Sequence, residues 1–186
     1  MSRKGEVTIH IGGVFATHEP TVIKTLLGSC IAACLRDPAT GIGGMNHFML
    51  PAAPNGDGEA NPARFGLHAM ELLIGKIQRL GGERSRLQAK VFGGGHVLQI
   101  AESAHGVPQQ NIRFIREFLR TEEIPLLAHD LGGRAARYVL FDTASGKVRV
   151  RRLAGMTSVT TVVEREHEAT AQQQIEQYGD VTLFED

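Results

Sequence analysis

The pattern that most constrains the fold is a β-hairpin signal in the first third of the chain. Residues Ile31 to Arg36 and Ile42 to Leu50 are mostly apolar, as expected of short buried strands. The five residues between them, Asp37-Pro38-Ala39-Thr40-Gly41, place Asp, Pro and Gly where a turn needs them. The sequence therefore predicts two antiparallel strands joined by a tight turn.

This hairpin has a chemical consequence, because Cys30 and His47 flank its turn. Folding it places Cys30 roughly opposite His47. Directly opposed residues of an antiparallel pair share one face, with Cβ atoms about 5 Å apart, so the thiol and the imidazole could meet there. A register shifted by one residue would instead put them on opposite faces. Whether Cys30 and His47 lie close together therefore depends on the register of the hairpin.

Strand patterns outnumber helix patterns in the rest of the chain. Alternation and short apolar runs predict strands at Glu6 to Ile11, Leu87 to Phe92, Ile124 to Ala128, Arg137 to Asp142 and Val148 to Leu153. Helical spacing with an Asn61-Pro62 start predicts a helix that buries Phe65, Ala69, Leu73, Ile77 and Leu80 and stops at Gly81-Gly82. A second helix is predicted over Asn111 to Arg120, with Ile112, Ile115 and Leu119 inward. Residues 52–58, rich in Pro, Asn and Gly, predict an exposed loop.

Length and composition predict one domain. A chain of 186 residues with 42% apolar content can build a single substantial core. The clear strand and helix patterns end at Leu153, so we expect the domain to span 1–153. We expect residues 154–186 to be a polar C-terminal extension, partly helical or disordered, with one further strand signal at Val159 to Val163.

Charge and cysteine content narrow the functional classes. Lys plus Arg and Asp plus Glu both total 20, so no overall field attracts nucleic acid or an anionic membrane. The sequence has no run of about 18 apolar residues, the length that membrane insertion requires. Two cysteines, about 13 Å apart on a strand, do not form a disulfide framework. We expect a cytoplasmic protein whose partner is a protein or a small molecule.

The residues around the hairpin suggest nucleophilic chemistry. A cysteine reacts as the thiolate, and His47 could serve as the base that ionises Cys30. Gly28 allows a tight bend that turns backbone N–H groups toward a developing oxyanion. Thr25 could orient the imidazole, although Thr is also a common strand residue and a main-chain carbonyl could serve instead. Cys34, inside an apolar run, is more typical of inert core.

Other polar motifs carry weaker signals. The remaining histidines show neither a His-Glu-x-x-His nor a Cys-x-x-Cys pattern, so we predict no metal and no cofactor. The glycine clusters at 93–95 and 132–133 do not continue as a phosphate loop, and they favour tight turns or a close backbone approach to a ligand. A solvated sheet edge, or less readily a receptor-binding patch, is predicted for Arg134, Arg137, Arg149, Arg151 and Arg152.

Taken together, the motifs resemble those of the CheD family of chemoreceptor glutamine deamidases over roughly Gly5 to Leu153. The similar blocks are Leu27-Gly28-Ser29-Cys30, Arg36-Asp37-Pro38, the run from Gly43 to Pro51, Lys90-Val91-Phe92-Gly93-Gly94, Asn111 in its helix, and Asp130-Leu131-Gly132-Gly133 with Arg137. The resemblance implies that Cys30 is the nucleophile, His47 the general base and acid, and Thr25 an assisting hydroxyl. No cofactor is implied.

The resemblance also implies a substrate, a partner and a fold. The reaction would convert specific glutamines of methyl-accepting chemotaxis receptors to glutamate and ammonia through a Cys–His thioester mechanism. A CheC-type phosphatase is an expected partner. The implied fold is an α+β arrangement of mixed β-sheets packed together with helices on the outside, resembling the catalytic domain of cytotoxic necrotizing factor. The predicted strands and two helices agree with it. Two alternatives are a Cys–His peptidase or amidase acting on another substrate, and a non-catalytic chemotaxis adaptor.

Overall fold

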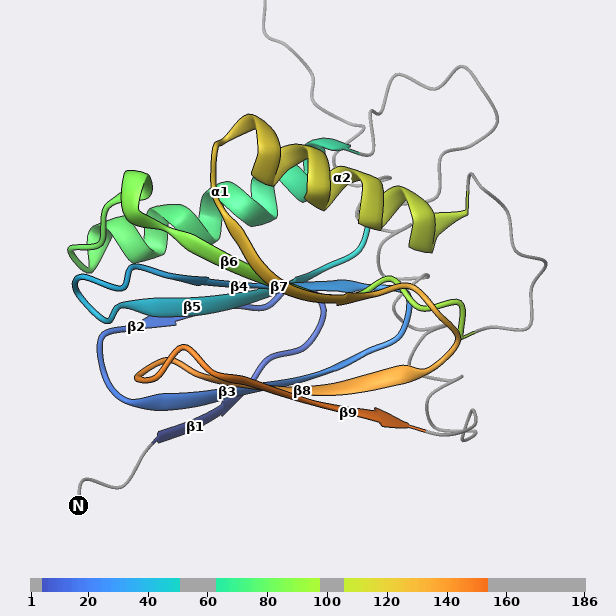
Figure 1. The fold of residues 1–186 in the computed structure, drawn as a ribbon, viewed down its shortest axis with the longest axis horizontal. Helices are drawn as coiled ribbons and strands as arrows, with labels where there is room; N and C mark the ends of the chain where they lie inside the picture. Colours follow the sequence, from blue (N-terminus) through green and yellow to red (C-terminus); the bar gives the residue numbers. More distant parts are fainter. Residues whose placement is uncertain (1–4, 51–62, 98–105, 154–186) are drawn as a thin grey trace, which may run out of the picture.

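Two β-sheets stack face to face, and both described helices cover the outer side of one of them (Figure 1). The computed structural model describes residues 5–50, 63–97 and 106–153. Each sheet is mixed, because β1 runs parallel to β3 in one sheet and β6 runs parallel to β7 in the other. The predicted α+β class with packed mixed sheets is confirmed. The described helices, however, lie on one side of the sandwich only.

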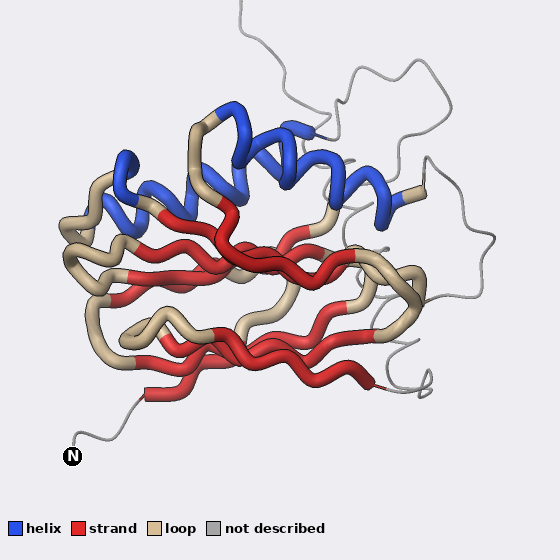
Figure 2. The backbone as a smooth tube through the Cα atoms, viewed as in Figure 1, coloured by secondary structure: helices blue, strands red, loops and turns tan. Residues whose placement is uncertain are grey.

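The elements follow each other along the chain as Figure 2 traces them. The four-stranded sheet has the order β1 (Gly5–Thr8), β3 (Thr21–Leu27), β8 (Ala136–Asp142), β9 (Val148–Leu153). The five-stranded sheet has the order β2 (Val14–Thr17), β5 (Gly43–Phe48), β4 (Ile31–Arg36), β6 (Gln88–Gly93), β7 (Leu126–Leu131). The helices are α1 (Ala63–Arg79), α2 (Val107–Thr121) and the short 3-10 helix η1 (Arg84–Arg86).

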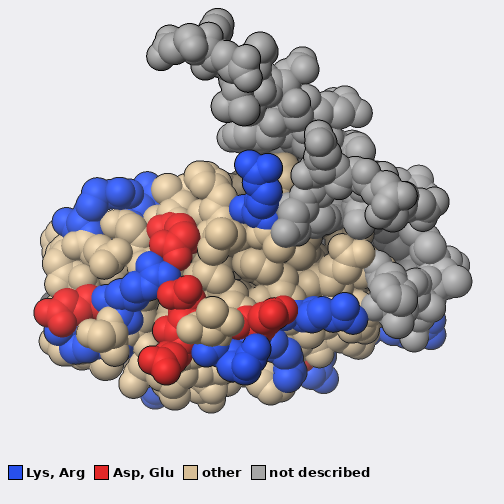
Figure 3. Space-filling model, turned by 90° about the horizontal axis from the view of Figure 1, so that it is seen from above, with Lys and Arg blue, Asp and Glu red and all other residues tan. Residues whose placement is uncertain are grey.

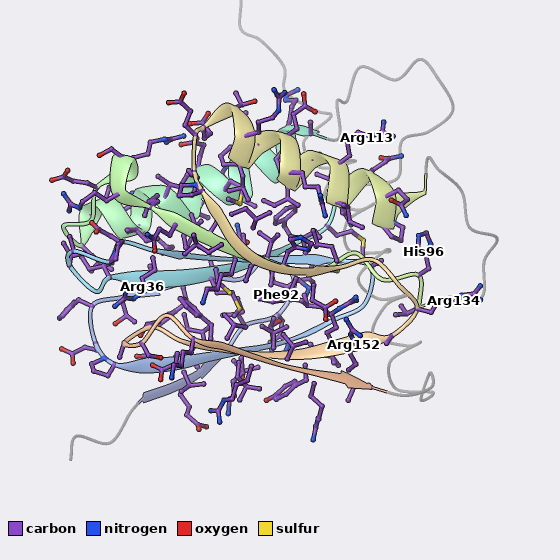
Figure 4. All side chains as sticks on the ribbon, in the orientation of Figure 1. Arg36, Phe92, His96, Arg113, Arg134 and Arg152 are labelled. Carbon is purple, nitrogen blue, oxygen red and sulfur yellow. The ribbon has the colours of Figure 1, made fainter. Side chains whose placement is uncertain are left out.

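Strand β4 lies at the centre of the five-stranded sheet and is buried on both faces. Its odd-numbered residues, such as Ile31 and Leu35, join a core with α1 and α2. Its even-numbered residues, such as Ala32 and Cys34, join the core between the sheets, where Phe92 also lies (Figure 4). Burial on both faces explains why this strand is a continuous apolar run rather than an alternating one.

The N-terminal prediction was partly wrong. The predicted strand Glu6 to Ile11 is shorter, ending at Thr8, because Gly13 donates a backbone hydrogen bond to the His10 carbonyl at 2.8 Å and Gly12 takes a φ of 77°. The chain turns there. Strands β2 and β3 had not been predicted, and β3 is mostly buried on both faces, which hides the alternation that marks a half-buried strand.

Both helices differ from their predicted bounds. The buried residues of α1 are Gly66, Met70, Leu73, Ile74 and Ile77, whereas Leu80 follows the helix and is exposed. The predicted Asn61-Pro62 start lies outside the described residues. Helix α2 begins at Val107, earlier than predicted, because Pro108 fits the first helical turn. Strand β7 lies further along the chain than the predicted Ile124 to Ala128.

The predicted strands Arg137 to Asp142 and Val148 to Leu153 are confirmed, and they pair as a second hairpin, β8–β9, with Phe141 opposite Val148 at its turn. Its turn is joined to the first hairpin by Arg36, whose Nε donates to the Thr143 carbonyl at 2.9 Å and whose Nη2 donates to the Ala144 carbonyl at 2.8 Å. Both turns therefore lie at one end of the sandwich, opposite the end that carries His96 (Figure 4). The predicted loop 52–58 and the extension 154–186 lie outside the described residues.

Surface charge is mixed on the helix side of the molecule, where Figure 3 shows basic and acidic side chains interspersed. This distribution agrees with the formal net charge of +0. Among the described residues, no helix has the length and apolar content needed to cross a membrane.

Candidate active site

The register of the first hairpin differs from the predicted one. Ala32, not Cys30, is the partner of His47. The strands begin to pair at Arg36 and Gly43, because the turn includes Ile42, whose carbonyl accepts the Asp37 N–H at 2.9 Å. The shift amounts to two residues, so the side-chain parity is kept and Cys30 still shares a face with His47. That face looks into the layer between the sheets.

Thr25 reaches His47 from the opposite sheet. Its Oγ1 lies 2.8 Å from His47 Nδ1, and both side chains are buried. The same hydroxyl donates to the Ile9 carbonyl at 2.9 Å. Because a hydroxyl has a single proton, Oγ1 must accept from Nδ1–H. The neutral ring then carries its proton on Nδ1 and its basic lone pair on Nε2.

The loop before β2 supports this pair from the backbone side. His47 donates its N–H to the Gly13 carbonyl at 3.0 Å and accepts from the Gly12 N–H at 2.8 Å. Ile9, which holds the Thr25 hydroxyl, belongs to the same loop. One short segment therefore fixes the imidazole through its backbone and through Thr25.

The glycine cluster after β6 packs against the backbone around Cys30. The N–H of Gly94 donates to the Cys30 carbonyl at 2.8 Å, and the N–H of Gly95 donates to the Gly28 carbonyl at 2.8 Å. A Cβ at Gly93, where φ is 114°, would lie 2.0 Å from the Cys30 carbonyl oxygen. The cluster therefore approaches the main chain of Cys30 closely, whereas the approach to a ligand stays a prediction.

Asn111 belongs to one of the blocks that resemble the CheD family, but the sequence does not predict its contacts. Its Nδ2 donates to the Ser29 carbonyl at 2.8 Å, and its Oδ1 accepts the Leu50 N–H at 2.8 Å. The side chain is fully buried on α2. A usable signal existed, because Asn111 stands at helical spacing with the inward residues Ile115 and Phe118.

Cys34 is core, as predicted. It lies on β4 and is almost fully buried, and burial raises the pKa of its thiol far above the usual range despite the opposing charge of Lys90. No disulfide joins it to Cys30. Asn46 points to the other face of β5 from His47, where its Oδ1 accepts the Ala33 N–H at 3.0 Å and its Nδ2 donates to the Ala69 carbonyl at 3.1 Å.

The arginine prediction needs one correction. Arg134, Arg149, Arg151 and Arg152 are exposed, as expected of a solvated edge. Arg137 is instead buried, because it faces the sheet interior and pairs with Asp130 at 3.2 Å. Arg152, labelled in Figure 4, also pairs with Asp130 at 2.9 Å. The Arg152 hydrogen bonds, helped by Arg137 and opposed by desolvation, lower the pKa of Asp130 to about 2.

Metal binding has no visible basis in the described part of the chain. Within residues 5–50, 63–97 and 106–153, no three His, Cys, Asp or Glu side chains come together as a metal site would require.

The fold and the site define a class: an α+β protein that gathers a thiol, an imidazole and a hydroxyl between two mixed sheets. A family model described as CheD chemotactic sensory transduction matches residues 49–152, more than half of the chain. The chain belongs to the CheD family.

Similar curated proteins cover more of the chain than the family model does. A protein of Hahella chejuensis, named "Probable chemoreceptor glutamine deamidase CheD", is 40% identical over 93% of this chain and 82% of its own length. The "Probable chemoreceptor glutamine deamidase CheD 1" of Shewanella oneidensis is 42% identical over 97% of this chain and 88% of its own length. These alignments extend well beyond the span of the family model.

A solved structure, Bacillus licheniformis hypothetical protein YfiH, aligns with a TM-score of 0.40 and 15% identity. It covers 62% of this chain and 49% of its own chain. This score is too low to assign a shared fold.

Proposed function

We propose that this protein is a chemoreceptor glutamine deamidase, which hydrolyses glutamine side-chain amides of methyl-accepting chemotaxis receptors to glutamate and ammonia. Family membership and the names of the relatives support the activity. The mechanism rests on one observation: the Thr25 hydroxyl accepts from His47 Nδ1, which leaves Nε2 as the base on the face shared with Cys30.

The first half of the reaction forms a thioester. His47 Nε2 takes the thiol proton of Cys30, and the thiolate attacks the amide carbon. The new C–S bond pushes the carbonyl electron pair onto oxygen, where the backbone N–H groups of Ser29 and Cys30 stabilise it. As this intermediate collapses, the C–N bond breaks and the imidazolium gives its proton to the departing nitrogen. Ammonia leaves, and the acyl group stays on sulfur.

The second half consumes water. The neutral His47 ring takes a proton from water, and the hydroxide attacks the thioester carbon. The C–S bond then breaks, the glutamate side chain is released and the proton returns to Cys30. Thr25 keeps Nδ1–H engaged throughout, and the Ile9 carbonyl behind it favours the imidazolium that forms in each half.

Substrate access requires movement. Cys30 is 0% exposed and His47 is 1% exposed. A glutamine side chain or any other reagent must contact the sulfur atom to react, so residues over the site have to shift before Cys30 reacts.

Several finer assignments belong to the same proposal. Residues 1–153 form the deamidase domain and 154–186 a polar C-terminal extension. The fold resembles the catalytic domain of cytotoxic necrotizing factor, the protein works in the cytoplasm, and a CheC-type phosphatase is a partner. The reaction uses no cofactor.

The decisive experiment incubates the purified protein with receptor cytoplasmic fragments and measures released ammonia and the mass of each receptor peptide. We expect glutamine-to-glutamate conversion with an intact receptor backbone, no conversion with Cys30→Ala, and normal conversion with the matched control Cys34→Ala. Cleaved receptor would favour the peptidase alternative. Full activity of Cys30→Ala in cells would favour the non-catalytic adaptor.

A further inference from the structure

We propose that Asn111 is a positioning residue for the deamidation reaction, which holds the Ser29–Cys30 peptide so that the Cys30 N–H is oriented to stabilise the oxyanion. This inference rests on the proposed function and assigns a task to a side chain that does not itself touch the substrate. The observation behind it is the pair of 2.8 Å hydrogen bonds that Asn111 makes to Ser29 and Leu50.

Both ends of the Asn111 carboxamide are committed. Its Nδ2 holds the residue directly before Cys30, and its Oδ1 holds Leu50, which follows β5 and thus lies close in sequence to His47. The two segments are 82 and 61 residues away from Asn111 in the chain. A single buried side-chain amide on α2 therefore fixes Ser29, directly before Cys30, relative to Leu50, shortly after His47.

Peptide geometry turns the first of these bonds into an orientation. The described residues contain no cis peptide bond, so the N–H of Cys30 points opposite to the carbonyl of Ser29. Because that carbonyl is aimed at Asn111 on α2, the Cys30 N–H points away from α2. The layer between the sheets, which contains the Cys30 side chain, lies on that side of the five-stranded sheet (Figure 1).

The preceding peptide is held in the same manner. The Gly28 carbonyl accepts the Gly95 N–H at 2.8 Å, which sets the direction of the Ser29 N–H. Two consecutive donors are thus oriented before any substrate binds. Fixed donors stabilise a developing oxyanion without reorganisation during the reaction, which is the main source of their catalytic effect.

Asn46 provides a matched control for the test. Asn46 also accepts a backbone N–H with Oδ1 and donates to a backbone carbonyl with Nδ2, but its partners are Ala33 and Ala69 on the helix side of the sheet. Asn111→Asp and Asn46→Asp, compared at pH 8, each keep the acceptor and remove the donor. Each variant is assayed for deamidation, for thermal unfolding and for the rate at which iodoacetamide alkylates Cys30.

Alkylation separates positioning from general damage, because its transition state develops no oxyanion. We expect Asn111→Asp to lower kcat about 10- to 100-fold with little change in KM, since one donor of an oxyanion hole is worth about 10²–10³ in kcat when lost outright. Its Cys30 alkylation rate should stay within about twofold of the wild type, because the thiolate is untouched. Asn46→Asp should keep both rates at a comparable loss of thermal stability.

Three results would overturn the inference: an unchanged kcat in Asn111→Asp, a parallel fall of alkylation and deamidation, or an equal loss of kcat in Asn46→Asp. If Asn111→Asp does not fold, Asn111→Ala replaces it under the same criteria. If the wild-type protein is alkylated at Cys30 but does not deamidate receptors, the proposed function is overturned. An active wild type with an equally active Asn111→Asp overturns the role of Asn111 alone.

Discussion

Thr25 in β3 and His47 in β5 are joined across the two sheets by a hydrogen bond of 2.8 Å. The Thr25 hydroxyl also donates a hydrogen bond to the Ile9 carbonyl. The imidazole is therefore oriented by a side chain of the four-stranded sheet, which is itself held by a carbonyl in the loop between β1 and β2. The protonation pattern of the ring is consequently a property of how the sheets stack. This arrangement leads to the first of five predictions.

Replacing Thr25 by Val removes the hydroxyl but keeps the shape of the side chain. His47 Nδ1 and the Ile9 carbonyl then lose their partner inside the protein, which costs about 1–3 kcal/mol of stability. The ring also loses its fixed tautomer, and kcat should fall about 10- to 100-fold. Thr25→Ser, which keeps the hydroxyl, should retain most of the activity. Urea unfolding and ammonia release measure the two effects, and an active Thr25→Val would exclude the orienting role.

Cys30 and Cys34 should differ in their reaction with iodoacetamide at neutral pH. Burial raises the pKa of the Cys34 thiol, so this residue stays protonated and unreactive. Cys30, on the face shared with His47, should be alkylated first. Mass spectrometry of peptides from the native protein gives both rates in one sample. Equal rates would contradict an activated thiolate at Cys30.

Asp37 should stabilise the fold without affecting catalysis. Asp37 is fully buried in the first hairpin turn. Its carboxylate contacts Arg86 Nη2 at 2.7 Å and accepts a hydrogen bond from the Glu83 N–H at 3.0 Å. Asp37→Asn should cost about 2 kcal/mol, because it removes the charge of a buried carboxylate whose partner Arg86 is 33% exposed. The matched control Glu83→Gln alters an exposed contact to the same arginine and should cost less than about 1 kcal/mol. Both variants should keep kcat, since the turn lies at the other end of β4 from Cys30.

Stability should fall in acid because of Asp130. Hydrogen bonds from Arg152, with help from Arg137, lower the pKa of Asp130 to about 2, against about 3.9 in an unfolded chain. A lowered folded-state pKa stabilises the protein above about pH 4, and this contribution is lost as the pH falls toward about 2. Urea midpoints between pH 6 and pH 2, expressed as free energies of unfolding, should decline less steeply for Asp130→Asn. An identical slope in the variant would rule out this assignment.

Two glycine-to-alanine changes should have opposite signs. Gly93→Ala places a Cβ 2.0 Å from the Cys30 carbonyl oxygen at a residue with a φ of 114°. It should cost more than about 2 kcal/mol and reduce kcat, because the peptide of Cys30 must move. Gly75→Ala lies within α1, where the nearest atom is an Arg79 nitrogen 3.7 Å away, and should gain about 0.5–1 kcal/mol. Differential scanning calorimetry of both variants decides the signs, and a neutral Gly93→Ala would refute the close approach.

Local sequence signals predicted the elements whose ends are marked by turn residues or by a clear change of hydrophobic pattern. The first hairpin was predicted because Asp37, Pro38 and Gly41 mark its turn and apolar residues flank it, and the strands of the second were predicted from alternation on either side of residues 143–147. Strand β3 was missed because burial on both faces removes alternation, and the inward face of α1 was misjudged because Leu80 falls after the helix. The bounds of an element depend on packing that a short window of sequence does not contain.

The sequence by itself determined that Cys30 and His47 flank the turn of one hairpin, but it left the register of that hairpin open. The structure pairs His47 with Ala32, two residues from the predicted partner, and this even shift keeps Cys30 and His47 on one face because side chains alternate along a strand. Only the tertiary structure decided what lies opposite that face. Thr25 meets the imidazole from another sheet, and Asn111 reaches Ser29 from a helix 82 residues further along the chain. Contacts between elements distant in the chain arise from the way the layers stack, and no local pattern of residues encodes them.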